Sequence, residues 1–484
     1  MLSLNSFLLK TQELKSTAII TDSIVLSYEQ LQQEVLNSSH TLSGFEIKEN
    51  DNVAVIGNND LDYIKLVLAL WQIKAVPVLI NPRLTASEIE EQINISNCKF
   101  VLINKNVGSG GTKPNIKIIF YPFTKVKDST NQIVADVLDP EATAVIIFTS
   151  GTAGSPKGVE LSFNSLKQSA KNCDQIISHT KNCKWLASLP FYHIGGFSII
   201  TRALLHDASI VIPASLNTSS LADAFDSYKP TYCSLVPTQL KRLLEAGVQS
   251  NDELKNVLVG GSVVDQQLIY NAIEEGWHIT TVYGLTETAS FVTALTENEI
   301  YYKPGSVGKA VKSIRIVIVN DNGHQVDIGE VGFVTISTTS LMKGYYNNER
   351  ETEVKLENGF FYSDDVGHLD EEGYLFLEAR KDDMIITGGE NVYPIEVENR
   401  IIEHPDVLDV AVFGKQDDEW GELVCAAIVL KDGKSGITLN DLEGFLEESL
   451  ASYKIPKKLF IRNELPRNEL GKLSKAGLAE MITE

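Results

Sequence analysis

Short apolar runs alternate with helix-length segments through the first half of this 484-residue chain. Residues 53–56 and 76–80 are apolar and rich in β-branched side chains, and residues 61–73 between them have a helical pattern. Such alternation is typical of parallel βα units, in which a helix connects two neighbouring parallel strands. The first half of the chain therefore predicts layered βα sheets.

The same alternation continues beyond this first unit. Thr85 and Glu88 have the spacing of a capping box and predict a helix start, followed by a strand at residues 100–104. Further strands are expected at residues 144–148, 209–212, 231–236, 256–259 and 279–283, and further helices at residues 237–247 and 265–276.

The pattern changes after about residue 305. Closely spaced β-type runs at residues 314–319 and 332–337, separated by Gly, Asn and Asp turns, predict a β subdomain at about residues 305–375. A charged cluster then precedes a compact unit with strands near residues 410–413 and 425–430 and a helix at residues 439–451. We therefore expect an α/β protein with a large N-terminal domain, residues 1–381, and a small α+β C-terminal domain, residues 382–484.

Composition excludes several classes of partner. With 42 basic and 64 acidic residues the formal charge is −22, which disfavours nucleic acid and anionic membranes. Apolar stretches end well short of the roughly 18 residues that a membrane span needs, and the N-terminus lacks a basic segment. Five cysteines without CxxC spacing argue against a disulfide framework and a zinc site. We expect a cytoplasmic protein; a homodimer is compatible with the sequence, which does not specify an oligomeric state.

A loop of small residues follows the apolar run at residues 144–148. Residues 149–158 read Thr-Ser-Gly-Thr-Ala-Gly-Ser-Pro-Lys-Gly. Glycines and hydroxyls let backbone N–H groups surround an anion, and Lys157 adds a positive charge. The loop is not a Walker A motif, because that motif ends in Gly-Lys-Ser/Thr. The segment is a candidate phosphate-binding loop, and a solvated turn is the alternative interpretation.

Acidic and basic residues with nucleotide-site chemistry follow in order. Glu287, just after the strand at residues 279–283, could ligate a magnesium ion bound to phosphates. Asp365 could accept hydrogen bonds from ribose hydroxyls. Arg380 comes next, and Lys472 lies near the C-terminus. Several such segments in a fixed order are far more specific than any one of them.

In the order and the sequences of these motifs, the chain resembles the AMP-forming acyl-CoA synthetases, or adenylate-forming ligases, from about residue 51 to the end. The resemblance implies a large N-terminal domain of βα layers with a β subdomain, joined by a hinge to a small mobile C-terminal domain. It implies ATP, Mg²⁺ and coenzyme A, and a reaction in two steps. A carboxylate is first adenylated with release of pyrophosphate, and the acyl group then passes to coenzyme A.

The resemblance also assigns residues to the nucleotide. Thr286 would lie at the α-phosphate, Glu287 at the magnesium ion, and Tyr283 beside the adenine or acyl pocket. Asp365 and Arg380 would hold the ribose. The residues assigned to the loop that closes on the ATP phosphates are Thr149, Ser150, Gly151, Thr152, Gly154 and Lys157.

Both half-reactions would use the mobile domain. By resemblance, Lys472 is the catalytic lysine of adenylation. Rotation about a hinge at Asp382 would then bring Gly388 and Gly389 inward for thioester formation, where paired glycines would let the pantetheine arm pass close to the backbone. The same segment is also typical of a turn before a helix that begins near Pro394, and both interpretations hold together.

Two positions depart from the family pattern. The family usually has Thr-Gly-Asp where this chain has Ser363-Asp364-Asp365, and the following Val-Gly favours Asp365 as the ribose ligand. If the glycine position required positive φ, aspartate would be among the less costly substitutes. The second departure is Ala379, where Gly or Asp commonly precedes the arginine, and we expect little effect from it.

The acyl pocket is expected around residues 189–196, where a single histidine, His193, lies. A single histidine is as often structural as functional, and the flanking motif favours function. His193 and Arg202 are candidates for binding a second substrate carboxylate, although Arg202 is also typical of a surface residue, which we favour. Candidates for the pocket walls are Ser198, Gly260, Gly261, Ser262 and Ser290.

Within the family, residues 189–196, 286–290 and 81–85, with Thr293, most resemble the o-succinylbenzoate-CoA ligases of menaquinone biosynthesis. Another aryl- or medium-chain acyl-CoA ligase is the main alternative, because its core motifs would be identical. A stand-alone adenylation domain that loads a carrier protein is a second alternative, but the acid that usually binds the substrate amine is absent near residues 191–194. A non-catalytic relative is disfavoured by Glu287, Asp365, Arg380 and Lys472.

Overall fold

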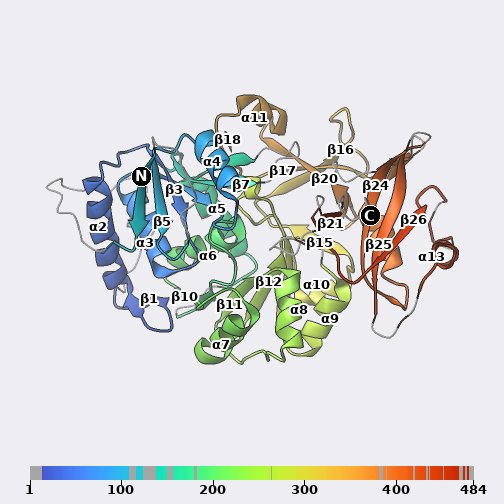
Figure 1. The fold of residues 1–484 in the computed structure, drawn as a ribbon, viewed down its shortest axis with the longest axis horizontal. Coiled ribbons are helices and arrows are strands. Elements are labelled where there is room, and N and C mark those ends of the chain that lie inside the picture. Colours follow the sequence, from blue (N-terminus) through green and yellow to red (C-terminus); the bar gives the residue numbers. More distant parts are fainter. Residues whose placement is uncertain are drawn as a thin grey trace. The chain divides into compact units, whose positions relative to one another are not determined.

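The computed structural model describes residues 14–107, 116–123, 138–149, 156–178, 182–262, 264–380, 385–387, 390–417, 420–431, 436–447 and 452–467, with a few shorter pieces up to residue 478. Its contacts divide the chain into two compact units. The first contains the residues up to Arg315 together with Ile336–Phe361, and the second contains Ile316–Thr335 and the residues from Tyr362 on. Both units combine strands and helices (Figure 1), which confirms the expected α/β class.

One sheet of the first unit has the order β18-β8-β7-β4-β3-β5-β6 among the described residues. Strands β3 to β7 pair in parallel, as the alternating pattern predicts, whereas β8 runs antiparallel to β7 and β18 antiparallel to β8. The bounds are β3 Asn52–Ile56, β4 Val76–Ile80, β5 Phe100–Asn104, β6 Lys117–Tyr121, β7 Thr143–Thr149, β8 Lys157–Ser162 and β18 Gly344–Tyr345.

A second sheet of this unit has the order β2-β1-β10-β9-β11-β12-β13-β14-β15. Its middle strands, from β1 to β13, pair in parallel, and antiparallel pairs close both ends. The bounds are β1 Thr17–Ile20, β2 Val25–Ser27, β9 Lys184–Leu186, β10 Ser209–Val211, β11 Tyr232–Leu235, β12 Asn256–Gly260, β13 Ile279–Tyr283, β14 Thr293–Leu295 and β15 Ser306–Ala310; a short strand β19, Leu356–Glu357, pairs with β20.

The helices of the first unit connect these strands. The capping box predicted at the start of α4 is confirmed, because the Thr85 hydroxyl accepts from Glu88 N at 3.3 Å and the Glu88 carboxylate accepts from Thr85 N at 2.7 Å. The bounds are α2 Tyr28–Gly44, α3 Leu61–Gln72, α4 Ala86–Ile95, α5 Phe163–Cys173, α6 Ile194–Leu205, α7 Thr218–Tyr228, α8 Pro237–Glu245, α9 Gln266–Glu274, the 3-10 helix η1 Thr286–Thr288, α10 Glu297–Ile300 and α11 Glu349–Lys355.

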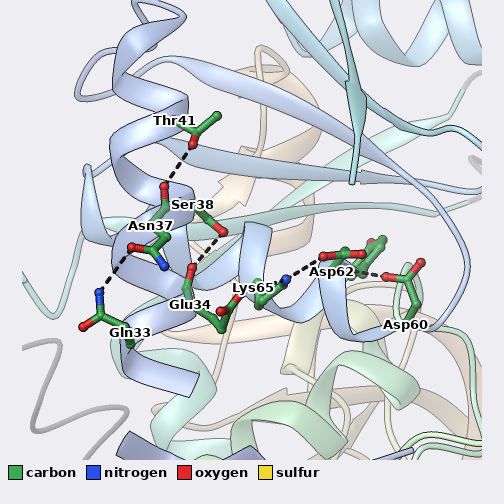
Figure 2. A network of polar contacts seen from close by, with 9 residues as sticks. Gln33, Glu34, Asn37, Ser38, Thr41, Asp60, Asp62 and Lys65 are labelled. Atoms are coloured by element: carbon green, nitrogen blue, oxygen red, sulfur yellow. Dashed lines mark hydrogen bonds and ion pairs between the residues drawn. The ribbon is translucent and has the colours of Figure 1, made fainter. Parts of the chain in front are cut away.

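A polar network joins α2 to α3 (Figure 2). The ammonium group of Lys65 lies 2.7 Å from Asp62 on its own helix and 3.3 Å from Glu34 on α2. Asp60 caps α3, because its carboxylate accepts a hydrogen bond from Tyr63 N at 2.6 Å. The other oxygen of this carboxylate accepts from the side-chain amide of Asn104, at the end of β5, also at 2.6 Å. The network ties the two packed helices to the end of β5.

In the second unit, β16, β17, β20 and β21 lie side by side in that order, and a separate five-stranded sheet is built from described residues as β23-β22-β25-β24, with β26 parallel to β25. Helix α13 ends at Leu446, so the predicted helix at residues 439–451 was too long. The reason is that Leu450 keeps helical spacing and packs in the same core without being helical. The bounds are β16 Arg315–Val319, β17 Gly332–Ser337, β20 Phe360–Leu369, β21 Tyr374–Arg380, β22 Ile385–Thr387, β23 Glu390–Val392, β24 Val407–Asp417, β25 Gly421–Leu430, β26 Lys458–Arg462, α12 Pro394–Ile401 and α13 Leu439–Leu446.

Two further expectations bear on this description. The hinge at Asp382 lies outside the described residues, so the boundary between residues 381 and 382 stays a prediction. In the part of the chain that the structure describes, no helix has both the length and the apolar character needed to cross a membrane.

Candidate active site

The candidate phosphate loop connects β7 to β8. Thr149 at the end of β7 and Lys157 at the start of β8 are paired in the antiparallel register. The structure therefore positions the two ends of the loop, whereas four of its predicted members lie outside the described residues, namely Ser150, Gly151, Thr152 and Gly154.

The ammonium group of Lys157 lies against an acid and an aromatic ring. It is 2.5 Å from a carboxylate oxygen of Glu351 and 5.3 Å from the ring centroid of Tyr345. The side chains of Lys157 and Glu351 are 15% and 29% exposed. Because both are largely shielded from water, their attraction is screened less than that of a surface pair.

Glu287 lies in η1, a short turn that directly follows β13 and also contains Thr286. The Tyr345 hydroxyl donates to Glu287 Oε1 at 2.9 Å, and Met342 N donates to the Glu287 carbonyl at 2.7 Å. Gly284 makes the turn sterically feasible, because a Cβ there would lie 1.4 Å from the Ser290 carbonyl oxygen. Tyr345 thus connects Glu287 to Lys157, a link that sequence reasoning missed.

The residues around Glu287 fit a magnesium ion in one way only. Among the described residues, no group of three or more His, Cys, Asp or Glu side chains could hold a metal. In nucleotide sites, however, Mg²⁺ is commonly held by one or two carboxylates, with substrate phosphates and water as the other ligands. A single carboxylate from Glu287 matches that donor set.

The glycines predicted for the acyl pocket have steric reasons to be glycine. Gly260 ends β12, where a Cβ would lie 2.4 Å from the Val282 carbonyl oxygen, and Gly261 has φ of +88°. Ser262 follows them and is partly buried. The chain can therefore pass close to β13, whose last residue, Tyr283, is buried.

His193 is the residue that precedes α6, and its ring lies 4.7 Å from the ring of Tyr192. Its own side chain is partly buried. Ser198, one turn further along α6, is 2% exposed and donates its hydroxyl to the Gly195 carbonyl at 2.9 Å. His193 therefore lies at the N-terminal end of α6, just before its first turn, while the Ser198 hydroxyl bonds to the helix backbone.

Two amide side chains hold the segment before His193. Asn59 donates to the carbonyls of Ala187 and Leu189 at 3.2 and 2.8 Å and accepts from Phe191 N at 2.8 Å. From another element, Gln239 donates to the Ser188 carbonyl at 2.9 Å. Sequence reasoning missed both contacts and had no signal for them, because the partner groups belong to the backbone of a distant segment.

Arg202 is buried, so the surface location that we favoured for it was wrong. It is 2% exposed, and its guanidinium lies 5.8 Å from the ring of Trp185 and 5.7 Å from that of Phe291. One terminal nitrogen lies 3.5 Å from Ser290 Oγ, and its Nε is buried without a hydrogen-bond partner among the described residues. The structure thus brings together two predicted pocket residues, Arg202 and Ser290, around a buried positive charge.

The predicted ribose residues lie on paired strands of the second unit. Asp365 on β20 is 5% exposed and lies opposite Arg380 of β21 in the strand register. Asp364 is an ordinary strand residue of β20, so its position does not require the positive φ that a glycine would tolerate. In this unit, the predicted residues that lie outside the described part of the chain are Asp382, Gly388, Gly389 and Lys472.

The five cysteines are buried, and none of them forms a disulfide bond. Burial raises the pKa of Cys173 to about 11 and, chiefly for the same reason, that of Cys98 to about 12. A thiol is a good nucleophile only as the thiolate. These cysteines are therefore poorly suited to covalent catalysis, in line with a reaction that needs no enzyme nucleophile.

Comparison with sequence families gives two matches. Residues 10–346 match the family described as AMP-binding enzyme, and residues 396–472 match the AMP-binding enzyme C-terminal domain.

Similar proteins cover nearly the whole chain. A 2-succinylbenzoate–CoA ligase from Bacillus cereus (strain Q1) is 31% identical over 472 residues, 97% of this chain and 96% of its own length. The enzyme of that name from Listeria monocytogenes is 31% identical, with 96% of each chain covered. Among solved structures, o-succinylbenzoate coenzyme A synthetase (MenE) from Bacillus subtilis, in complex with ATP and magnesium ion, superposes with a TM-score of 0.89 at 29% identity, covering 97% of this chain and 98% of its own.

Proposed function

The chain belongs to the AMP-binding enzyme family, and we propose that it is an AMP-forming ligase that joins 2-succinylbenzoate to coenzyme A. The observation that carries this function is the similarity to 2-succinylbenzoate–CoA ligases over nearly the whole chain. ATP, Mg²⁺ and coenzyme A are the cofactor and co-substrates of this reaction, which belongs to menaquinone biosynthesis.

The reaction has two steps. A carboxylate oxygen of the acid attacks the α-phosphorus of ATP, and the bond to pyrophosphate breaks, leaving an acyl-AMP mixed anhydride. The sulfur of coenzyme A then attacks the acyl carbon, and AMP leaves with the electron pair of the broken C–O bond. Charge builds up on the phosphate oxygens during the first step, so the enzyme must supply fixed positive groups and hydrogen-bond donors there.

We assign the phosphate side of this chemistry to the first unit. Lys157, Thr149 and the small residues between them would cradle the phosphates, and Thr286 would bind at the α-phosphate. Glu287 would ligate Mg²⁺, which when bound neutralises phosphate charge. The support is that both residues contact Tyr345: Lys157 lies over its ring, and Glu287 accepts a hydrogen bond from its hydroxyl.

We assign the ribose and the mobile groups to the second unit. Asp365 and Arg380 would hold the ribose hydroxyls, and their positions opposite each other on β20 and β21 support this role. Lys472 would act in adenylation. A C-terminal domain beginning at the Asp382 hinge would then turn, so that Gly388 and Gly389 line the path of the pantetheine arm.

The buried charge of Arg202 supports a substrate with a second carboxylate. A buried guanidinium needs a compensating anion or several acceptors, and Arg202 Nε has none among the described residues. The carboxylate of 2-succinylbenzoate that does not react could supply that anion, with Ser290 beside Arg202 as a polar wall group. His193, before the start of α6, is the second candidate for contact with the substrate. Gly260, Gly261 and Ser262 would leave room for the aromatic ring.

The function is tested by measuring CoA-thioester formation with a panel of acids under ATP and Mg²⁺. We expect 2-succinylbenzoate to have the highest kcat/KM and AMP, not ADP, to be released. If benzoate or hexanoate ranks above it, the enzyme is another acyl-CoA ligase. Arg202→Met should raise KM for 2-succinylbenzoate about tenfold or more and leave benzoate, which lacks the second carboxylate, unaffected.

The role of Lys472 is tested by separating the half-reactions. Lys472→Ala should abolish adenylation, measured as ATP–pyrophosphate exchange, and leave thioester formation from supplied acyl-AMP largely intact. Equal loss of both steps would contradict the use of two domain orientations.

We also propose a cytoplasmic location, where ATP and coenzyme A are available, and small molecules as the partners.

A further inference from the structure

Glu351 has no place among the groups that the family resemblance assigns, yet it makes the ion pair with Lys157. It lies in the first turn of α11, a seven-residue helix, where its backbone N donates to the side chain of Asn348 at 3.2 Å. An acid in a first helical turn usually serves the helix itself, because it lies at the positive end of the helix dipole. Its carboxylate here also contacts Lys157 at 2.5 Å.

Backbone pairing fixes this contact. Strand β18 pairs with β8, so that Tyr345 lies opposite Val159, and Tyr346 N donates to the Gly158 carbonyl at 2.7 Å. Tyr345 N in turn donates to the hydroxyl of Thr352 on α11 at 2.9 Å, which ties β18 to that helix. The start of β8 and the start of α11 are therefore held side by side, and the Lys157–Glu351 pair follows from that register.

We propose that Glu351 holds Lys157 in an ion pair that competes with nucleotide binding. When ATP binds, its phosphates would have to take the place of the Glu351 carboxylate beside the Lys157 ammonium group. The inference rests on the proposed role of Lys157 at the ATP phosphates. A triphosphate carries several negative charges, so it competes with a single carboxylate for the ammonium group. Lys157 remains beside the Tyr345 ring in either case, which limits the movement to the end of its side chain.

In this role Glu351 is a positioning residue, and removing its charge should change ATP affinity in one definite direction. Removing its charge leaves Lys157 without a carboxylate to give up, so ATP should bind more tightly. If Glu351 instead directs Lys157 towards the phosphates, the same change should weaken ATP binding. If Glu351 serves only α11, the change should alter stability and leave nucleotide affinity alone.

The test compares ATP affinity in the full-length protein by isothermal titration calorimetry, with Mg²⁺ and without an acid substrate. The variants are Glu351→Gln, Lys157→Ala and the double variant. Glu349→Gln is the matched control, because Glu349 occupies the same first turn of α11, is exposed and carries the same charge. Adenosine serves as the ligand without phosphates.

We expect Glu351→Gln to lower the Kd for ATP about threefold, the size of a partly exposed ion pair, with adenosine unaffected. Glu349→Gln should leave both constants unchanged, and the gain should vanish when Lys157 is already alanine. If the Kd for ATP is unchanged or higher in Glu351→Gln while Lys157→Ala weakens ATP binding, the competing ion pair is ruled out. The proposed role of Lys157 at the phosphates would then still stand. Unchanged ATP affinity in Lys157→Ala would overturn both.

Discussion

Two networks in the first unit each place a lysine beside acidic side chains. Lys65 on α3 pairs with Asp62 and Glu34 (Figure 2). The other contacts drawn on α2 lie within that helix, two from a hydroxyl to a backbone carbonyl and one between the side chains of Gln33 and Asn37. Lys157 on β8 pairs with Glu351 and lies over Tyr345, which holds Glu287. The first network joins two helices, whereas the second joins β8, β18 and the start of α11 to the turn after β13.

The chemistry of the two ion pairs is the same, so the pairs themselves do not reveal function. What differs is the neighbourhood. Lys65 lies within the regular helix α3, which Asp60 caps, whereas Lys157 begins the strand that follows a loop of glycines and hydroxyls. We therefore expect changes in the Lys157 network to affect catalysis and changes in the Lys65 network to affect stability.

The largest effect should come from Glu287→Gln. The amide keeps the shape of the side chain but removes the charge proposed to ligate Mg²⁺, so kcat should fall about 100-fold or more. Steady-state CoA-thioester formation measures this loss. The urea midpoint of unfolding should stay near that of the wild type, because the Tyr345 hydroxyl can still donate to the amide oxygen.

Two outcomes would contradict the assignment of Glu287 to catalysis and so remove the difference between the two networks. One is activity within tenfold of wild type at saturating Mg²⁺. The other is a large loss of stability, since it would place Glu287 with the structural residues. A calorimetric titration of Mg²⁺ with ATP present gives a second readout, in which the variant should bind the ion more weakly.

Asp60, at the end of the helix network, should make stability depend on pH. Burial, followed by the charge of Asp62, raises the pKa of Asp60 to about 6, against the lowering effect of its hydrogen bonds. The folded state then holds this proton more tightly than the unfolded state, so stability falls as pH rises from about 4 to about 6. Relative to Asp60→Asn, the wild type should lose on the order of 2 kcal/mol over this window.

Urea unfolding of both proteins at pH 4, 5, 6 and 7 measures that difference. Asparagine can keep the cap on Tyr63 N, so it serves as an uncharged reference. A constant difference between the two proteins across this range would mean that Asp60 ionises in the fold as it does in the unfolded chain. The ranking of acids as substrates should not change in Asp60→Asn.

Tyr345→Phe tests the link between Glu287 and Lys157. The variant keeps the ring under Lys157 and loses the hydroxyl that donates to Glu287 at 2.9 Å. A hydrogen bond to a charged group is worth about 1.5–3 kcal/mol, so kcat/KM for ATP should fall about tenfold, with KM for the acid unchanged. The loss should be smaller in a Glu287→Gln background, because a neutral amide oxygen is a weaker acceptor than a carboxylate. An equal loss in that background would show that the hydroxyl acts elsewhere.

The sequence predicted the scaffold of this site well. The strands at residues 76–80, 100–104 and 279–283 were predicted with the bounds of β4, β5 and β13, because each is a short run rich in apolar or β-branched residues between turn or helix signals. The turn at Glu287 follows from β13, and the start of the candidate loop follows from the strand predicted at residues 144–148, which is β7. Strand β8, at the far end of the loop, was not predicted. Local patterns suffice for such elements, since the hydrophobic period and the turn residues lie within one segment.

Contacts across long separations could not be predicted in the same way. Lys157 and Glu351 are 194 residues apart, and nothing near Glu351 distinguishes it from Glu349. Arg202 was misjudged because arginine is usually exposed, whereas here the rings that cover it come from Trp185 and Phe291 on other elements. The partners of a polar side chain depend on strand register, which only the assembled fold provides.

Lys65→Met should have the smallest effect and is the matched counterpart of the Lys157 variants. Burial alone would lower the pKa of Lys65, but the hydrogen bond and charge of Asp62 and those of Glu34 outweigh it and raise the pKa. Methionine keeps most of the packed stem and removes the charge, so the unfolding free energy should drop by about 0.5–1 kcal/mol, as for a partly exposed pair. ATP affinity and kcat should match the wild type. A change in ATP affinity comparable to that in Lys157→Ala would mean that the two networks are coupled through α3, and the distinction between a structural and a catalytic lysine would fail.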